Sequence, residues 1–170
     1  MDSGPFTYRR RLPHLRLEGS IYFVTWRVKP GAPEMNSEER SIVMSTLLHF
    51  DRQRYVLHAF VIMNDHVHVV FYPLGDFTVQ KIIHSWKTFS SNEVRRLTGR
   101  QSGLWQEEYL DRIIRDEDEY WEKLQYIMDN PLKRWPEEVD YEWVMWFKDA
   151  MGASFPVHKS NAPPSESGAT

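Results

Sequence analysis

Two apolar runs separated by a two-residue turn signal constrain the fold of this chain more than any other feature. Residues 55–63 read YVLHAFVIM, and residues 66–73 read HVHVVFYP. Both runs are rich in β-branched and aromatic residues, a composition typical of strands. Asn64 and Asp65, which separate the runs, are residue types that favour tight turns. The pattern therefore predicts an antiparallel β-hairpin in the middle of the fold.

Strand and helix patterns alternate on either side of this hairpin. Strands are expected at 20–28, 55–63, 66–73 and 109–115, and helices at 37–52, 77–98 and 117–130. Gly99 is expected to end the second helix and Pro131 the third. The order β-α-β-β-α-β-α predicts an α+β fold, in which helices flank an antiparallel sheet of four to five strands. This arrangement resembles the ferredoxin-like, split βαβ architecture.

A length of 170 residues indicates one domain, which we expect to span residues 1–150. It would include a basic N-terminal arm at about 1–19 and an aromatic C-terminal extension at about 136–150. Residues 151–170 are rich in Ser, Pro, Gly and Ala, which predicts a disordered tail. The chain has no cysteine, which excludes disulfides, zinc fingers and thiol nucleophiles. With no apolar run long enough to span a bilayer, we expect no membrane partner and a cytoplasmic location.

The charge of the chain is unevenly distributed, although the net charge is only −3. Basic side chains gather near the start and on the second predicted helix, whereas acidic residues dominate after residue 115. The net charge argues against a uniformly basic nucleic-acid-binding protein, but it permits a local basic face. Such clusters are compatible with DNA binding and equally with an ordinary solvated surface. The candidates for DNA binding are Arg9, Arg10, Arg11, Lys81, Lys87, Arg95 and Arg112.

His66 and His68 are two residues apart on a predicted strand, so their side chains project from the same face. Two adjacent imidazoles form half of a plausible divalent-metal site. The alternative is a pair of structural histidines whose hydrogen bonds are satisfied within the fold. A metal site needs a third ligand, and the HxHxDH motif of metallohydrolases is excluded because Val70 occupies the aspartate position.

The last predicted helix offers a third ligand. Tyr126 and Asn130 are spaced i, i+4 and therefore lie on one helical face. The Asn130 carboxamide oxygen could coordinate a hard cation, which would place the Tyr126 hydroxyl near that ion. The alternative is that Tyr126 is a half-buried aromatic residue of an amphipathic helix. Other tyrosines could compete for a chemical role: Tyr22, Tyr109 and Tyr120.

The HVH within VIMNDHVHVV, together with YIMDNP, resembles the HUH single-tyrosine transposases, and most closely their REP-associated tyrosine transposase branch. Further similar segments are YRRRLPHL, YFVTWRV, SWKTFSSNEV and LWQEEYLDRIIRDEDEY, so the resemblance covers about residues 8–135. Asn64 stands where the family often has proline. We interpret this difference as a changed hairpin turn that leaves the histidine ligands intact.

The resemblance implies that His66, His68 and Asn130 bind one divalent cation, Mg²⁺ or Mn²⁺, and that Tyr126 is the catalytic nucleophile. It implies a single-stranded DNA endonuclease and strand transferase that forms a 5′-phosphotyrosine and acts on hairpin-forming repeats. The expected partner is single-stranded or hairpin DNA, and the expected state is a monomer or homodimer. Two other functions remain open: a domesticated, non-catalytic hairpin-binding protein, and a metal-dependent hydrolase of small substrates.

Overall fold

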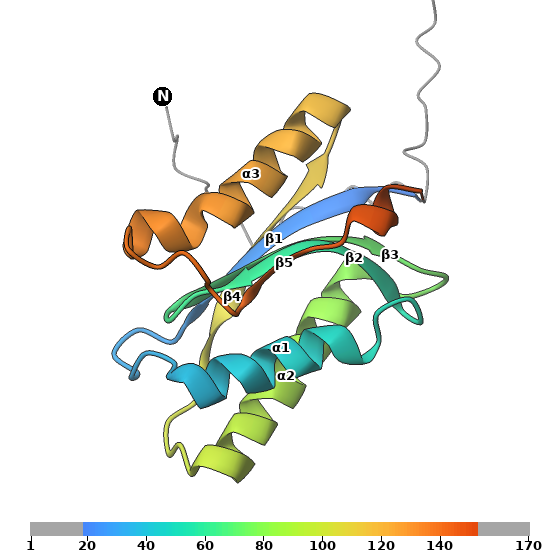
Figure 1. Ribbon diagram of the computed structural model, residues 1–170. Coiled ribbons are helices and arrows are strands. Elements are labelled where there is room, and N and C mark those ends of the chain that lie inside the picture. Colours follow the sequence, from blue (N-terminus) through green and yellow to red (C-terminus); the bar gives the residue numbers. More distant parts are fainter. Residues whose placement is uncertain (1–18, 153–170) are drawn as a thin grey trace, which may run out of the picture.

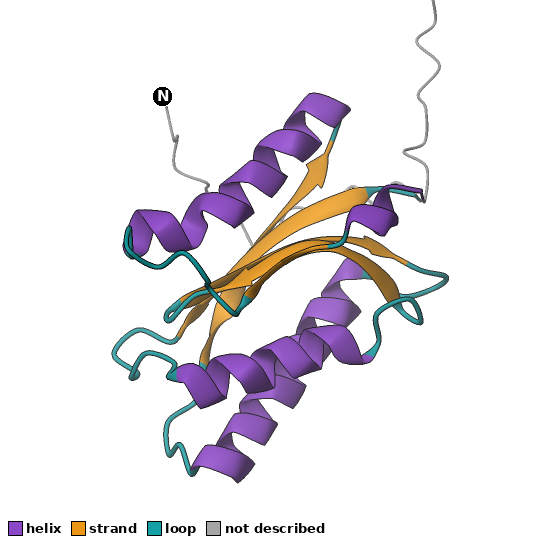
Figure 2. Cartoon of the chain, in the orientation of Figure 1, coloured by secondary structure: helices purple, strands orange, loops and turns teal. Residues whose placement is uncertain are grey.

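A five-stranded antiparallel sheet lies between two layers of helices in the computed structural model, which describes residues 19–152 (Figures 1 and 2). The strands are β1 (Ile21–Val28), β2 (Tyr55–Ile62), β3 (His66–Pro73), β4 (Trp105–Ile114) and β5 (Val144–Trp146). The helices are α1 (Ser37–His49), α2 (Val79–Thr98), α3 (Glu117–Arg134) and the short 3₁₀ segment η1 (Lys148–Gly152). Within this range, none of the helices combines the length and apolarity that a membrane span requires.

The strand order is β4-β1-β3-β2-β5, and every neighbouring pair is antiparallel. The hairpin of β2 and β3 lies inside the sheet, with β3 inserted between β1 and β2. Helices α1 and α2 cover one face of the sheet, and α3 crosses the other face (Figure 1). The predicted α+β, ferredoxin-like order is confirmed, and the aromatic C-terminal extension supplies the fifth strand, β5.

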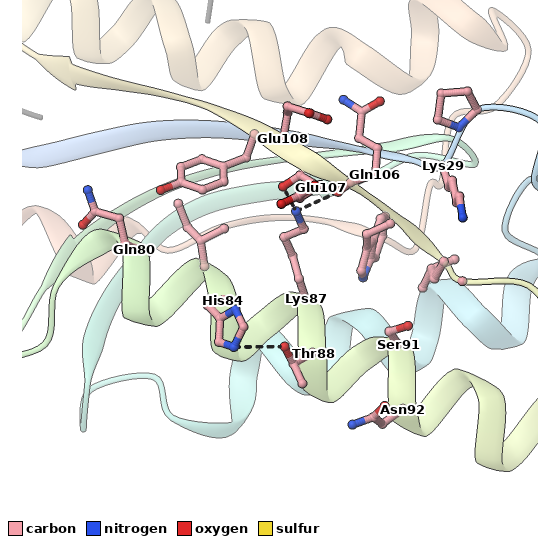
Figure 3. A pocket seen from close by; sticks show the side chains of 16 residues that line it. Lys29, Gln80, His84, Lys87, Thr88, Ser91, Asn92, Gln106, Glu107 and Glu108 are labelled. Atoms are coloured by element: carbon pink, nitrogen blue, oxygen red, sulfur yellow. Dashed lines mark hydrogen bonds between the residues drawn. The ribbon is translucent and has the colours of Figure 1, made fainter. Parts of the chain in front are cut away.

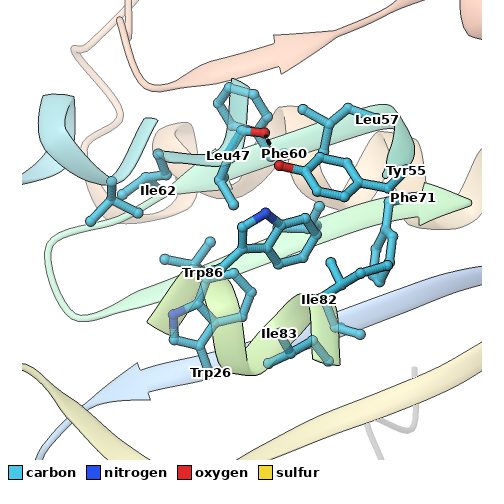
Figure 4. Packing of buried hydrophobic residues seen from close by; sticks show 14 of the residues in the cluster. Trp26, Leu47, Tyr55, Leu57, Phe60, Ile62, Phe71, Ile82, Ile83 and Trp86 are labelled. Carbon is cyan, nitrogen blue, oxygen red and sulfur yellow. Dashed lines mark hydrogen bonds between the residues drawn. The ribbon is translucent and has the colours of Figure 1, made fainter. Parts of the chain in front are cut away.

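The core between the sheet and helices α1 and α2 combines aliphatic side chains with a cluster of packed aromatic rings (Figure 4). Trp86 of α2 stacks on Trp26 of β1, with ring centroids 5.9 Å apart. It also contacts Tyr55 and Phe71 edge to face, each at 4.8 Å. The buried Tyr55 hydroxyl donates a hydrogen bond to the Leu47 carbonyl oxygen of α1 at 2.7 Å. This packing fixes both helices on the sheet.

A β-bulge in β2 changes which side chains face each layer. Leu57 pairs with Phe71, whereas Ala59 pairs with Val70, so His58 is an additional residue in the strand. As a result, Leu57 and Ala59 face opposite layers. Leu57 packs in the α1–α2 core, and Ala59 packs on the α3 side. The side chain of His58 reaches α3, where its Nδ1 lies 2.8 Å from the Tyr120 hydroxyl.

The C-terminal ends of two helices differ from the sequence-based prediction, as do the starts of α2, at Val79 instead of residue 77, and of β4, at Trp105 instead of residue 109. Helix α3 continues past Pro131 to Arg134, so the prediction that Pro131 ends it is wrong. Within the last turn, proline removes only the one hydrogen bond that would have reached the Ile127 carbonyl, and the Trp135 amide still donates to the Pro131 carbonyl at 2.7 Å. Helix α1 ends at His49, three residues early, because the chain turns through Arg52 with φ of 63°.

Candidate active site

His66 and His68 of β3 both face the layer that contains α3, with their ring centroids 4.7 Å apart. The intervening Val67 and the following Val69 are fully buried in the α1–α2 core. The expected placement of both imidazoles on one face is therefore confirmed. Phe23 of β1 stacks on His68, with ring centroids 5.5 Å apart, and forms the side of the site next to β1.

Each imidazole is oriented by an oxygen at its Nδ1 atom. The Nδ1 of His66 lies 2.6 Å from Oδ1 of Asp65, and the Nδ1 of His68 lies 2.6 Å from Oγ1 of Thr25. Each of these oxygens can accept a hydrogen bond from Nδ1–H. With the proton on Nδ1, an imidazole has at Nε2 the lone pair that a metal ligand requires.

The Nε2 atoms of the two histidines have different surroundings. The Nε2 of His66 lies 3.2 Å from Oδ1 of Asn130, a residue that is itself buried on α3. The Nε2 of His68 is buried and has no hydrogen-bond partner in the described part of the chain. A buried polar nitrogen without a partner is costly, and a cation held by His66, His68 and Asn130 would supply one for His68. The donor set therefore fits a divalent metal ion.

The candidate metal site needs Asn130 as its third ligand. Residues 19–152 contain no group of three His, Cys, Asp or Glu side chains that could hold a metal ion. A site at β3 therefore depends on two imidazole nitrogens and one amide oxygen, a mixed set compatible with Mn²⁺ or Mg²⁺. Burial lowers the pKa of His68 well below its usual range, and the charge of the neighbouring His66 lowers it further, followed by those of Arg27, Lys123 and Lys133. His68 is thus neutral at physiological pH, as metal coordination requires.

Tyr126 lies beside the histidine pair and is 39% exposed. Its ring centroid is 5.1 Å from that of His68. The competing Tyr120 is fully buried, and burial raises its pKa to about 12. Tyr22 is buried in the α1–α2 core, and Tyr109 packs against that same core. Of the four tyrosines considered from the sequence, Tyr126 is the one that adjoins His68 and remains accessible.

Several side chains at this site were missed by the sequence-based interpretation. Thr25 and Arg27 reach it because they pair in register with His68 and His66 across the β1–β3 ladder. The sequence alone does not reveal which residues of β1 and β3 pair. Lys133, in contrast, follows Tyr126 by seven residues, or two helical turns, so helical spacing alone could have identified it.

Of the predicted DNA-binding residues within 19–152, the three on α2 lie away from the histidine pair. Arg9, Arg10 and Arg11 lie outside the described residues. Lys81, Lys87 and Arg95 belong to α2, on the opposite face of the sheet from α3 (Figure 1). Arg112 of β4 forms an ion pair with Glu119. A role in DNA binding stays a prediction for each of them.

Lys87 has a structural contact in addition to any role in binding. Its Nζ donates hydrogen bonds to the carbonyl oxygens of Gln106 and Glu107, at 2.8 and 2.7 Å (Figure 3). It lines a cavity of about 1140 Å³ between α2 and β4. The ammonium group therefore joins α2 to the edge strand of the sheet.

This chain combines a five-stranded sheet, a histidine pair on β3 and a tyrosine on the facing helix, and it was compared with known proteins. Residues 21–130 match the family described as IS200-like transposases, and the chain belongs to this family. The matched range includes His66, His68, Tyr126 and Asn130.

Two relatives refine this placement. A Haemophilus influenzae protein that bears the name REP-associated tyrosine transposase is 28% identical over 140 residues, which cover 74% of this chain and 78% of that protein. The solved structure of a REP-associated tyrosine transposase bound to a REP hairpin superimposes with a TM-score of 0.66 at 22% identity, covering 87% of each chain. The resemblance found in the sequence is thereby confirmed at the level of family and fold.

Proposed function

We propose that this transposase-family protein is a metal-dependent, single-stranded DNA endonuclease and strand transferase with Tyr126 as its nucleophile. One observation carries the proposal. The accessible Tyr126 ring lies 5.1 Å from the ring of His68, whose buried Nε2 has no partner in the described chain. A nucleophile beside side chains that can hold a divalent ion is an arrangement suited to phosphoryl transfer.

His66, His68 and Asn130 would hold one Mg²⁺ or Mn²⁺ ion. When bound, such an ion acts as a Lewis acid and template for a phosphate group. Asp65 and Thr25 keep the two imidazoles in the orientation and tautomer that ligation needs. The hydrogen bond between Tyr120 and His58 anchors α3 to β2, and so holds Tyr126 and Asn130 over the histidines.

The reaction exchanges one ester bond for another. Oη of Tyr126 bonds to the phosphorus while the bond from phosphorus to the 3′ oxygen breaks. The tyrosine gives up its hydroxyl proton to solvent, and the departing 3′ oxygen takes one up as a hydroxyl. The resulting 5′-phosphotyrosine keeps an ester at phosphorus, so attack by another 3′-hydroxyl releases Tyr126 and joins strands without an added energy source.

We infer that the substrate is a single strand from a hairpin-forming repeat. The relative whose fold this chain shares was solved with a REP hairpin. The exposed Arg27 lies on the strand beside the histidine pair, and the exposed Lys133 lies over Tyr126, so positive charge surrounds the reacting position. A localised group of cations suits phosphate contact in a protein of net negative charge.

The test is a covalent-adduct assay with a 3′-labelled hairpin oligonucleotide and Mn²⁺, analysed on a denaturing gel. We expect the wild-type protein to form an adduct and Tyr126→Phe to form none, because phenylalanine lacks the attacking oxygen. Tyr109→Phe, which alters a tyrosine on the α1–α2 side of the sheet, is the matched control and should react normally.

Three outcomes would count against parts of the proposal. An undiminished adduct with Tyr126→Phe would remove Tyr126 from the nucleophile role. Adduct formation in excess EDTA would exclude the metal. A mobility shift on a native gel, with no adduct in any condition, would instead support a hairpin-binding protein without catalysis.

A further inference from the structure

Lys133 lies directly over the ring of Tyr126, with its Nζ 4.7 Å from the ring centroid. The two residues are seven positions apart on α3, so they occupy the same helical face. Lys133 is exposed at the outer end of the site, and no ion pair joins it to a carboxylate in residues 19–152. Its four-carbon stem leaves the ammonium group able to move from the ring to a ligand at the tyrosine oxygen.

The other lysine of this face has a different environment. Lys123 is buried, with a side chain only 10% exposed. Its Nζ lies 3.3 Å from Oε1 of Glu122 and 5.3 Å from the centroid of the Phe23 ring. Lys123 therefore adds positive potential from the buried side of the site, next to Phe23, where a DNA strand has no access. Lys133 is the lysine on α3 whose charge can reach a phosphate held at Tyr126.

We propose, on the basis of the proposed function, that Lys133 is a catalytic residue whose ammonium group contacts the non-bridging oxygens of the phosphate attacked by Tyr126. Negative charge on these oxygens increases as the bond from Oη to phosphorus forms and the bond to the 3′ oxygen breaks. A positioned cation stabilises this charge more strongly than bulk water does. Lys133 neither gains nor loses a proton, and the same contact persists in the 5′-phosphotyrosine.

The experiment combines a protein variant with a change in the charge of the scissile phosphate. Single-turnover adduct formation with Mn²⁺ is measured on a phosphodiester and on a methylphosphonate, which has no negative charge at that position. On the phosphodiester, Lys133→Ala should slow the reaction about 100-fold, and Lys133→Arg should recover most of the rate. On the methylphosphonate, wild type and Lys133→Ala should differ by about tenfold at most, because a methyl group replaces one of the charged oxygens that Lys133 contacts.

A second measurement compares binding affinities and does not depend on bond cleavage. In the unreactive Tyr126→Phe background, the ratio of affinities for the phosphodiester and the methylphosphonate oligonucleotide reports the contact directly. Adding Lys133→Ala should bring this ratio closer to one. The matched control is Lys148→Ala, since Lys148 also lies over an aromatic ring, that of Trp146, at 5.3 Å. It should leave both the rate and the ratio unchanged.

The outcomes separate this proposal from the one on which it rests. Equal losses for Lys133→Ala on both substrates, or no loss on the phosphodiester, would overturn the role of Lys133 and leave the nucleophile intact. An unchanged affinity ratio would overturn it in the same way. A wild-type protein that forms no adduct would contradict the proposed function itself, and the catalytic role of Lys133 with it.

Discussion

The two faces of the sheet are built from different kinds of residue. The face under α1 and α2 is an apolar core in which Trp86 packs on both Trp26 and Tyr55. The face under α3 buries polar side chains as well, including His58 and His68. Burying apolar area stabilises a fold, whereas burying polar groups costs free energy unless they are paired. The first face therefore stabilises the domain, and the second holds groups that serve the site.

The largest effect is expected from Trp86→Ala, which empties the centre of the α1–α2 core. Trp86 is 2% exposed and contacts aromatic rings from three strands. Truncation of a buried tryptophan typically lowers the free energy of unfolding by roughly 3–5 kcal/mol. Urea denaturation followed by circular dichroism measures this change.

Trp121→Ala is the matched substitution on the other side of the sheet. Trp121 lies on α3 and is 37% exposed, so its removal should cost less than about 1 kcal/mol. Equal losses for the two tryptophans would contradict the division between a stabilising face and a functional face.

A second effect concerns pH, through His58 on the α3 side. Burial lowers the pKa of His58 to about 4 from an ordinary 6.5, and Arg52 adds to the shift. The unfolded chain therefore binds a proton at higher pH than the folded chain, so stability falls as the pH drops from about 6.5 towards 4. The loss should reach roughly 3 kcal/mol when His58 becomes protonated in both states.

His58→Gln isolates this contribution. Glutamine can still pair with the Tyr120 hydroxyl, but it does not titrate. The free energy of unfolding of the variant should fall less steeply than that of the wild type when urea denaturation is compared at pH 7 and pH 4.5. Parallel pH profiles for the two proteins would show that His58 does not drive the loss.

The smallest expected effect is stabilisation by Mn²⁺. A ligand at ten times its dissociation constant raises the free energy of unfolding by about 1.4 kcal/mol when it binds the folded state alone. Thermal denaturation of the wild type with and without Mn²⁺ should show this gain, and His68→Ala should lose it. If both proteins gain equally, the metal binds elsewhere.

The sequence predicted the elements of the fold because each carries its own local signal. The hairpin, with its paired apolar runs, and α2, with Gly99 at its end, matched closely. Pro131 was misjudged because the cost of proline depends on which turn of the helix it occupies. Strand β5 has only three residues, Val144–Trp146, and it exists because it pairs with the edge of β2. A contact between distant segments leaves no periodicity in so short a stretch.

The candidate site shows the same division between local and tertiary information. Strand spacing places His66 with His68, and helix spacing places Tyr126 with Asn130, from the sequence alone. The meeting of these two pairs depends on how α3 crosses the sheet, which the family resemblance supplied and spacing could not. Thr25, which orients His68, could be identified only from the β1–β3 register.

The order of the site residues along the chain has a consequence for protein synthesis. His66 and His68 are made first, and about sixty further residues separate them from Tyr126 and Asn130. A growing chain that has released the hairpin from the ribosome therefore has both imidazoles but neither the Tyr126 hydroxyl nor the Asn130 amide oxygen. Tyr126 emerges with α3, after β1 to β4 have been synthesised. The proposed cleavage site is thus incomplete until α3 has been made.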